Sequence, residues 1–258
     1  MLHFIRFYSG EGKPTILFRE NGEVEALELR KKEKIDFSGS LACIGFRTPK
    51  GYKECKNHAI NVKQCPLCSY LDMAKAYTVG DFTGFPSLYE KAKKEKYILY
   101  LAGFGEKLIK CGVTRKERFS ERMREQGSDF GCIVAEFSGP DKVYGAEASL
   151  QSRFSFANAV RMAQKMRMLS FDKQEAKMNF ESIVEMVKTS EVLPSFSPKV
   201  IDFSEFYPKI NSPKYSDSVI GKILGAKGEI LLFSSGSGEQ YAVNMRQKIG
   251  TFFKRETE

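Results

Sequence analysis

Short apolar runs that alternate with polar residues mark both ends of the chain. The opening segment contains HFIRFY, PTILFRE and EVEALELR, and Asn21-Gly22 separates the last two runs. An Asn-Gly pair between such runs favours a β-hairpin, so residues 1–40 are predicted to form a β-meander. Residues 195–258 form a second β-rich segment, in which three strands punctuated by glycine follow a proline-marked connector. We expect the two ends of the chain to pair in one small β-barrel or sandwich.

The centre of the chain has a mixed pattern that predicts an α/β core over residues 90–190. KYILYLAGFGEKLIKCGVTR contains two apolar runs joined by GFG, which predicts a second hairpin. KERFSERMREQG is predicted to be helical, because Phe119 and Met123 are four residues apart and Gly127 follows as a stop signal. CIVAEF reads as a third strand, and GAEASLQSRF, NAVRMAQKMRML and KQEAKMNFESIVEMVK read as helices. The predicted class is therefore α+β.

Composition and charge suggest the kind of partner. At 258 residues and 42% hydrophobic, the chain is predicted to be folded, and no apolar run approaches the length of a membrane span. No secretory signal is recognisable, so we expect a cytoplasmic protein with no membrane partner. The formal net charge is +9, and residues 91–126 hold eleven Lys or Arg against five acidic residues. Such a positive field attracts phosphates, so we expect a nucleic-acid partner, with RNA slightly favoured over DNA.

Four cysteines within residues 43–68 form the clearest candidate site. Cys65 and Cys68 make a CPLC knuckle, and Cys55 and Cys43 precede it in a segment rich in turn residues. In a reducing compartment, clustered cysteines are more often metal ligands than disulfides. Four thiolates suit tetrahedral Zn²⁺, and a shell closed by protein ligands is structural. The sequence thus predicts a zinc-binding module at residues 41–80. A site that uses His58, with Cys43 as a buried thiol, is the alternative.

The order of residues in the central block resembles the GIY-YIG nuclease superfamily. The matching pieces are a tyrosine-bearing strand, a strand ending in glycine, a helix with arginine and a later helix with glutamate, found here as YILYLAG, LIKCGVTR, RFSERMREQG and GAEASL. The whole layout is also similar to an uncharacterised prokaryotic domain-of-unknown-function family with an amino-terminal four-cysteine site. Its pattern is matched by YLA at 100–102, KCGVTR at 110–115, QG at 126–127, Glu147, GAKG at 225–228, NMR at 244–246 and Gly250.

The superfamily resemblance implies roles for individual residues. Tyr100, or Tyr97 as the alternative, would help to activate the attacking water. Arg118 or Arg122 would stabilise charge on the scissile phosphate. Glu147 would hold a Mg²⁺ or Mn²⁺ ion.

Lys110 departs from the superfamily pattern, because a tyrosine normally stands at this position two residues before the glycine. A lysine with an ordinary pKa is protonated, so Lys110 can bind phosphate but cannot act as a general base unless it is desolvated. It is therefore a candidate catalytic residue only in a modified mechanism. The resemblance leaves two functions open: a metal-dependent endonuclease, and a non-catalytic RNA-binding or ribosome-associated module that keeps the phosphate-binding cleft.

Both functions require basic residues that contact a phosphate backbone. The glycines beside Lys227 could let a backbone approach closely, although a tight hairpin turn explains them equally well. The candidate nucleic-acid contacts are Lys107, Lys110, Arg115, Lys116, Arg118, Arg122, Lys227 and Arg246.

Overall fold

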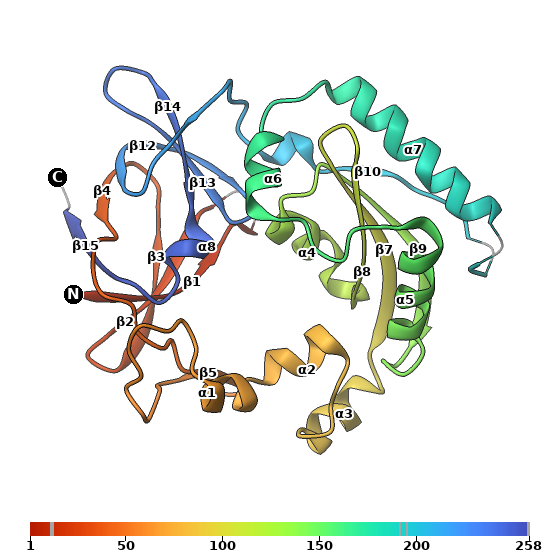
Figure 1. Cartoon of the computed structure of the whole chain (residues 1–258), viewed down its shortest axis with the longest axis horizontal. Coiled ribbons are helices and arrows are strands. Elements are labelled where there is room, and N and C mark those ends of the chain that lie inside the picture. The colour runs from red at the N-terminus through yellow and green to blue at the C-terminus, as the bar shows by residue number, and fades with distance from the viewer. Residues whose placement is uncertain (11–12, 191, 195, 257–258) are drawn as a thin grey trace. The chain divides into compact units, whose positions relative to one another are not determined.

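A computed structural model describes residues 1–10, 13–190, 192–194 and 196–256. The chain is a mixed α+β protein that divides into two compact units (Figure 1). Unit 1 consists of Met1–Phe85 and Pro213–Glu258, and unit 2 consists of Pro86–Ser212. No helix in the described part of the chain is long and apolar enough to cross a bilayer.

Unit 1 is built on one nine-stranded sheet, in the order β11-β14-β13-β12-β4-β15-β1-β2-β3. Strands from the two ends of the chain are neighbours in it, because β15 lies between β4 and β1, and β12 pairs with β4. The elements of unit 1 are β1 (Leu2–Tyr8), β2 (Thr15–Glu20), β3 (Glu23–Glu28), β4 (Lys32–Asp36), β5 (Phe46–Thr48), β6 (Gly51–Lys53), α1 (Pro66–Leu71), α2 (Met73–Val79), β11 (Lys214–Tyr215), β12 (Val219–Lys227), β13 (Ile230–Ser234), β14 (Gln240–Asn244), α8 (Met245–Lys248) and β15 (Phe252–Glu256).

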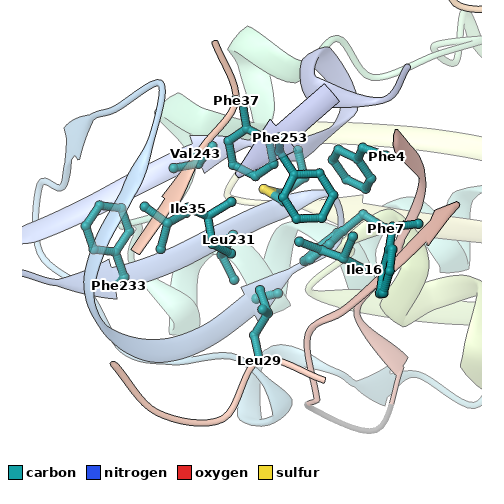
Figure 2. Close-up of a cluster of buried hydrophobic side chains, with 14 residues drawn as sticks. Phe4, Phe7, Ile16, Leu29, Ile35, Phe37, Leu231, Phe233, Val243 and Phe253 are labelled. Atoms are coloured by element: carbon teal, nitrogen blue, oxygen red, sulfur yellow. The ribbon is translucent and has the colours of Figure 1, made fainter. Parts of the chain in front are cut away.

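One hydrophobic cluster joins the two ends of the chain. Phe4 and Ile16 come from the first segment, and Leu231, Val243 and Phe253 come from the last, and all five pack into the same buried cluster (Figure 2). Burying each such side chain contributes about 1.5–3 kcal/mol relative to its exposure to water. The sheet is therefore held by its ladder and by a core that neither end could form alone.

Of the two arrangements expected from the sequence, a barrel or a sandwich, the barrel is wrong. In the described residues the sheet stays open, with β11 and β3 as its edge strands. Strand β11 has only two residues, and β3 places Glu23 and Glu25 on an exposed edge. Short or charged edge strands resist further pairing, which accounts for the open sheet. The hairpin expected at Asn21-Gly22 is present between β2 and β3, with left-handed φ values of 50° and 87°.

Unit 2 contains a four-stranded sheet in the order β10-β9-β7-β8. Successive residues of β7 point to opposite faces. Leu99 and Leu101 pack with residues of α5 and α7, whereas Ile98 and Tyr100 pack with residues of α4. The elements of unit 2 are α3 (Pro86–Ala92), β7 (Lys96–Phe104), β8 (Leu108–Arg115), α4 (Phe119–Gln126), β9 (Phe130–Ser138), α5 (Val143–Phe154), α6 (Met162–Arg167), α7 (Lys173–Thr189) and β10 (Ile201–Asp202), with 3₁₀ turns at Lys116–Arg118 and Ser204–Phe206.

Candidate functional site

The four cysteines of residues 43–68 form one buried cluster in unit 1. The sulfur atoms of Cys43, Cys55, Cys65 and Cys68 all lie within 4.8 Å of one another, and the Cys55 and Cys65 sulfurs are 3.8 Å apart. A tetrahedral Zn²⁺ with Zn–S bonds of about 2.3 Å separates its sulfur ligands by about 3.8 Å. The cluster can therefore hold a metal ion such as zinc. His58 is exposed and does not belong to the group.

Backbone geometry brings these sulfurs together. Pro66 is the first residue of α1, so the helix starts directly after Cys65 and carries Cys68 one turn later. The Cys65 and Gly45 amides donate to the Cys43 sulfur at 3.2 and 3.5 Å. Gly45 has a φ of 81°, and a Cβ there would lie 1.9 Å from the Lys53 carbonyl oxygen, so the turn requires glycine.

The electrostatics of the cluster favour thiolate at one position. Burial raises the pKa of Cys55, but hydrogen bonds from the Ala59 and Asn57 amides and from the Cys43 and Cys68 side chains together outweigh that effect and hold the pKa at about 7. Burial raises the pKa of Cys68, and its sulfur neighbours raise it further. A bound divalent cation would remove this conflict, because metal ligation deprotonates a thiol.

Asp72 braces the loops that carry the cysteines. It is only 5% exposed, and it accepts hydrogen bonds from the Ala74 amide at 3.0 Å, Arg47 Nε at 3.0 Å and Gln64 Nε2 at 2.9 Å. One carboxylate thus caps α2 and ties it to β5 and to the residue before Cys65.

A second polar cluster surrounds Tyr100 in the centre of unit 2. Tyr100 pairs with Gly112 across β7 and β8, and a Cβ at position 112 would lie 2.4 Å from the tyrosine hydroxyl. Gln126 Nε2, from the end of α4, donates to this hydroxyl at 2.7 Å, and Arg122 interacts with it electrostatically. Tyr100 is 1% exposed; burial raises its pKa, and the Arg122 charge acts in the opposite direction.

Lys110 and Glu147 complete the cluster. Lys110 lies two residues before Gly112 and therefore on the same face of β8, and it interacts electrostatically with both Arg122 and Glu147. Burial and the Arg122 charge lower the pKa of Lys110. Burial raises the pKa of Glu147, and Lys110 opposes that shift. Four elements, β7, β8, α4 and α5, thus bring one tyrosine, two cations and one carboxylate together, all but the tyrosine being half-buried.

The structure distinguishes between the alternative residues that the sequence left open. Arg118 turns toward two acids, with Nε 2.9 Å from Glu121 and Nη2 3.0 Å from Glu125. Arg122 shares Glu125, with Nη1 3.3 Å from its carboxylate, and interacts electrostatically with Tyr100. The Tyr97 hydroxyl faces Glu95 at 3.4 Å. Arg122 and Tyr100 are therefore the members of each pair that meet in the cluster.

The other basic candidates are scattered. In unit 2, Arg115 pairs with Glu95, Lys116 pairs with Glu136, and Lys107 is exposed. In unit 1, Lys227 is only 7% exposed and offers little surface to a ligand, whereas the Arg246 side chain is 66% exposed.

Sequence patterns missed several contributors to these sites. Gln126 was visible only as part of a short QG match, because a glutamine at a helix end has no distinctive spacing. Asp72 lies before a seven-residue helix whose start could have been recognised from an N-cap aspartate.

Comparison with known proteins places the chain in a family. A family model described as "Protein of unknown function (DUF2797)" matches residues 31–252. No curated protein and no solved structure matches.

Proposed function

This chain belongs to DUF2797, a family of unknown function, and we propose from its residues that it is a zinc-stabilised nucleic-acid-binding protein and a metal-dependent endonuclease. The observation that carries the proposal is the meeting of Tyr100, Lys110, Arg122 and Glu147, which come from four different elements. Their order along the chain is the one that the resemblance to GIY-YIG nucleases implies. We assign the four cysteines to a structural Zn²⁺ and the protein to the cytoplasm.

The polar cluster has the chemistry that phosphodiester cleavage needs. Lys110 and Arg122 supply two positive charges for a phosphate, and the half-buried site strengthens their attraction to it. Glu147 is the residue that would hold a Mg²⁺ or Mn²⁺ ion, which supplies Lewis-acid stabilisation of the charge that develops on the phosphate. Arg122 also interacts electrostatically with Tyr100, the residue assigned to water activation.

One observation favours a second function. The Tyr100 hydroxyl is buried, its pKa is raised by burial, and it already accepts a hydrogen bond from Gln126. A general base has to contact the water whose proton it removes. The buried Tyr100 hydroxyl can do so only if the cluster rearranges. The second candidate is therefore a non-catalytic RNA-binding or ribosome-associated module that uses Lys110 and Arg122 to bind phosphate.

The two functions differ in their products. Purified protein is incubated at low salt with labelled single- and double-stranded RNA and DNA, with Mg²⁺, with Mn²⁺ or with neither ion. The metal-free control leaves out both ions and contains no strong chelator, because a chelator would also remove the metal ion from the cysteine cluster. Cleavage that requires the ion and is lost in Glu147→Ala supports the nuclease. Uncut probes whose binding weakens steeply with salt support the binding module.

A matched pair of arginine variants tests the site itself. Arg122→Ala removes a member of the cluster, whereas Arg118→Ala removes an arginine of the same helical region that is engaged by Glu121 and Glu125. Arg122→Ala should weaken binding or cleavage at least about tenfold, and Arg118→Ala should have a much smaller effect. Absence of both binding and cleavage in the wild type would contradict both candidate functions.

A further inference from the structure

A buried arginine lies beside the cysteine cluster. Arg19, in β2, is 5% exposed. Its Nη1 and Nη2 atoms both donate to the Ile44 carbonyl oxygen at 3.4 Å, and its Nε has no hydrogen-bond partner. No carboxylate in the described part of the chain lies within ion-pair distance of Arg19. A buried cation without a counter-charge is costly, so an anion is expected nearby.

The groups around Arg19 identify the anion. Ile44 follows Cys43 directly in the chain, and Arg19 interacts electrostatically with Glu54 and, less strongly, with Cys43 and Cys55. Glu54 is exposed, and its charge is screened by solvent. His3, the other titratable group that faces Arg19, has its pKa lowered by burial and adds no negative charge. The cysteine cluster is thus the buried source of negative charge.

We propose that Arg19 is a counter-charge of the metal centre: its guanidinium offsets one of the two net negative charges that a divalent ion and four thiolates carry together. Arg19 is a positioning residue, since it touches the loop of the ligands and not the ion. Its two hydrogen bonds fix the Ile44 carbonyl between Cys43 and the obligatory turn at Gly45. Partners outside the ligand shell commonly change metal affinity 10- to 100-fold.

The proposal rests on the metal centre and is independent of any action on nucleic acid. The first measurement is therefore the zinc content of the purified wild type. One zinc per chain is expected, and a chain purified without metal would overturn the metal centre and the role of Arg19 together. Zinc in the wild type with unchanged zinc retention in Arg19→Gln would overturn the role of Arg19 alone.

Three single variants separate charge from hydrogen bonding. Arg19→Gln removes the charge and keeps a donor, Arg19→Lys keeps the charge, and Glu54→Gln removes the exposed neighbour. Zinc transfer to an excess of a chromogenic chelator should be about 10- to 100-fold faster in Arg19→Gln. It should stay within a few-fold of the wild type in Arg19→Lys and Glu54→Gln. If zinc is lost equally fast from Arg19→Lys and Arg19→Gln, the shape of the arginine side chain matters and its charge does not, and the proposal is overturned.

A double variant tests the charge directly. Cys68→His keeps a metal ligand but removes one negative charge from the centre. The loss of zinc affinity caused by Arg19→Gln should then be smaller than it is beside four cysteines, because the attraction that it removes is weaker. Strictly additive losses in the double variant would contradict charge compensation. Far-ultraviolet circular dichroism of the zinc-loaded variants checks that the sheet is intact.

Discussion

At the scale of single residues, Gly112 decides how Tyr100 lies. The tyrosine ring crosses the neighbouring strand directly over this glycine, which has no side chain to displace it. The requirement follows from close approach and not from backbone conformation, since Gly112 has no left-handed φ. The same contact places the Tyr100 hydroxyl where Gln126 and Arg122 can reach it.

Gly112→Ala should therefore destabilise unit 2. Its Cβ would lie 2.4 Å from the Tyr100 hydroxyl oxygen and 2.6 Å from Cζ, so the ring has to move. Overpacking of this kind costs about 1–3 kcal/mol. Gly145→Ala, at a helical position with nothing within 4 Å, is the matched control and should be neutral or stabilising by up to about 1 kcal/mol. The thermal unfolding midpoints of the two variants are compared with that of the wild type. Equal midpoints for the two variants would contradict the prediction.

For two members of the polar cluster, the sequence left a pair of alternatives: Tyr100 or Tyr97, and Arg122 or Arg118. Arg118 and Arg122 are four residues apart, and periodicity alone does not show which one faces the sheet. Both arginines pair with Glu125, and Arg118 also pairs with Glu121, but Arg122, one turn further along, is the one that interacts with Tyr100. Ion pairs three residues apart are local and can be read from spacing, but the approach of Arg122 to Tyr100 depends on how the helix packs against the sheet, which a single sequence does not specify.

At the scale of elements, the short helices around the cysteines are held by side-chain contacts. Helices α1 and α2 have six and seven residues, too few for a helix to be stable by itself. Strong local signals predicted the longer elements, such as the β7–β8 hairpin and the helix stopped by Gly127. The short helices were not predicted, because fewer than two full turns show no clear periodicity.

Asp72→Ala should open the cysteine loops. The variant loses the N-cap of α2 and leaves Arg47 and Gln64 without their carboxylate partner, at a cost of about 2–4 kcal/mol in local stability. Asp172→Ala is the matched control, because this exposed aspartate caps α7 through the Gln174 and Glu175 amides alone. Its cost should be about 1 kcal/mol. Hydrogen exchange of peptides covering α2 and α7 measures the loss of local stability in each variant. A larger loss at α7 in Asp172→Ala than at α2 in Asp72→Ala would refute the bracing role.

At the scale of the whole molecule, the two units differ in how the chain builds them. Unit 2 is one continuous segment with its own hydrophobic clusters on both faces of its sheet. Unit 1 needs both ends of the chain, as the alternating patterns at those ends led us to expect. The alternating pattern shows which strands have one apolar face but not how far the sheet curves, so the sequence did not show that the nine-stranded sheet stays open and does not close into a barrel.

Removal of residues 213–258 should therefore unfold residues 1–85 and spare unit 2. The deletion takes away β12 and β15, leaves β4 without its ladder partners, and removes half of the buried residues in the unit 1 cluster. It also removes the Gly250 carbonyl, which accepts from the Ala42 amide next to Cys43, so zinc should be lost as well. A segment of residues 86–212 expressed alone is the control and should stay folded. Limited proteolysis with mass spectrometry tests this: cleavage sites in the deletion should fall within residues 1–85, and rapid degradation of the 86–212 segment would show that the units are not independent.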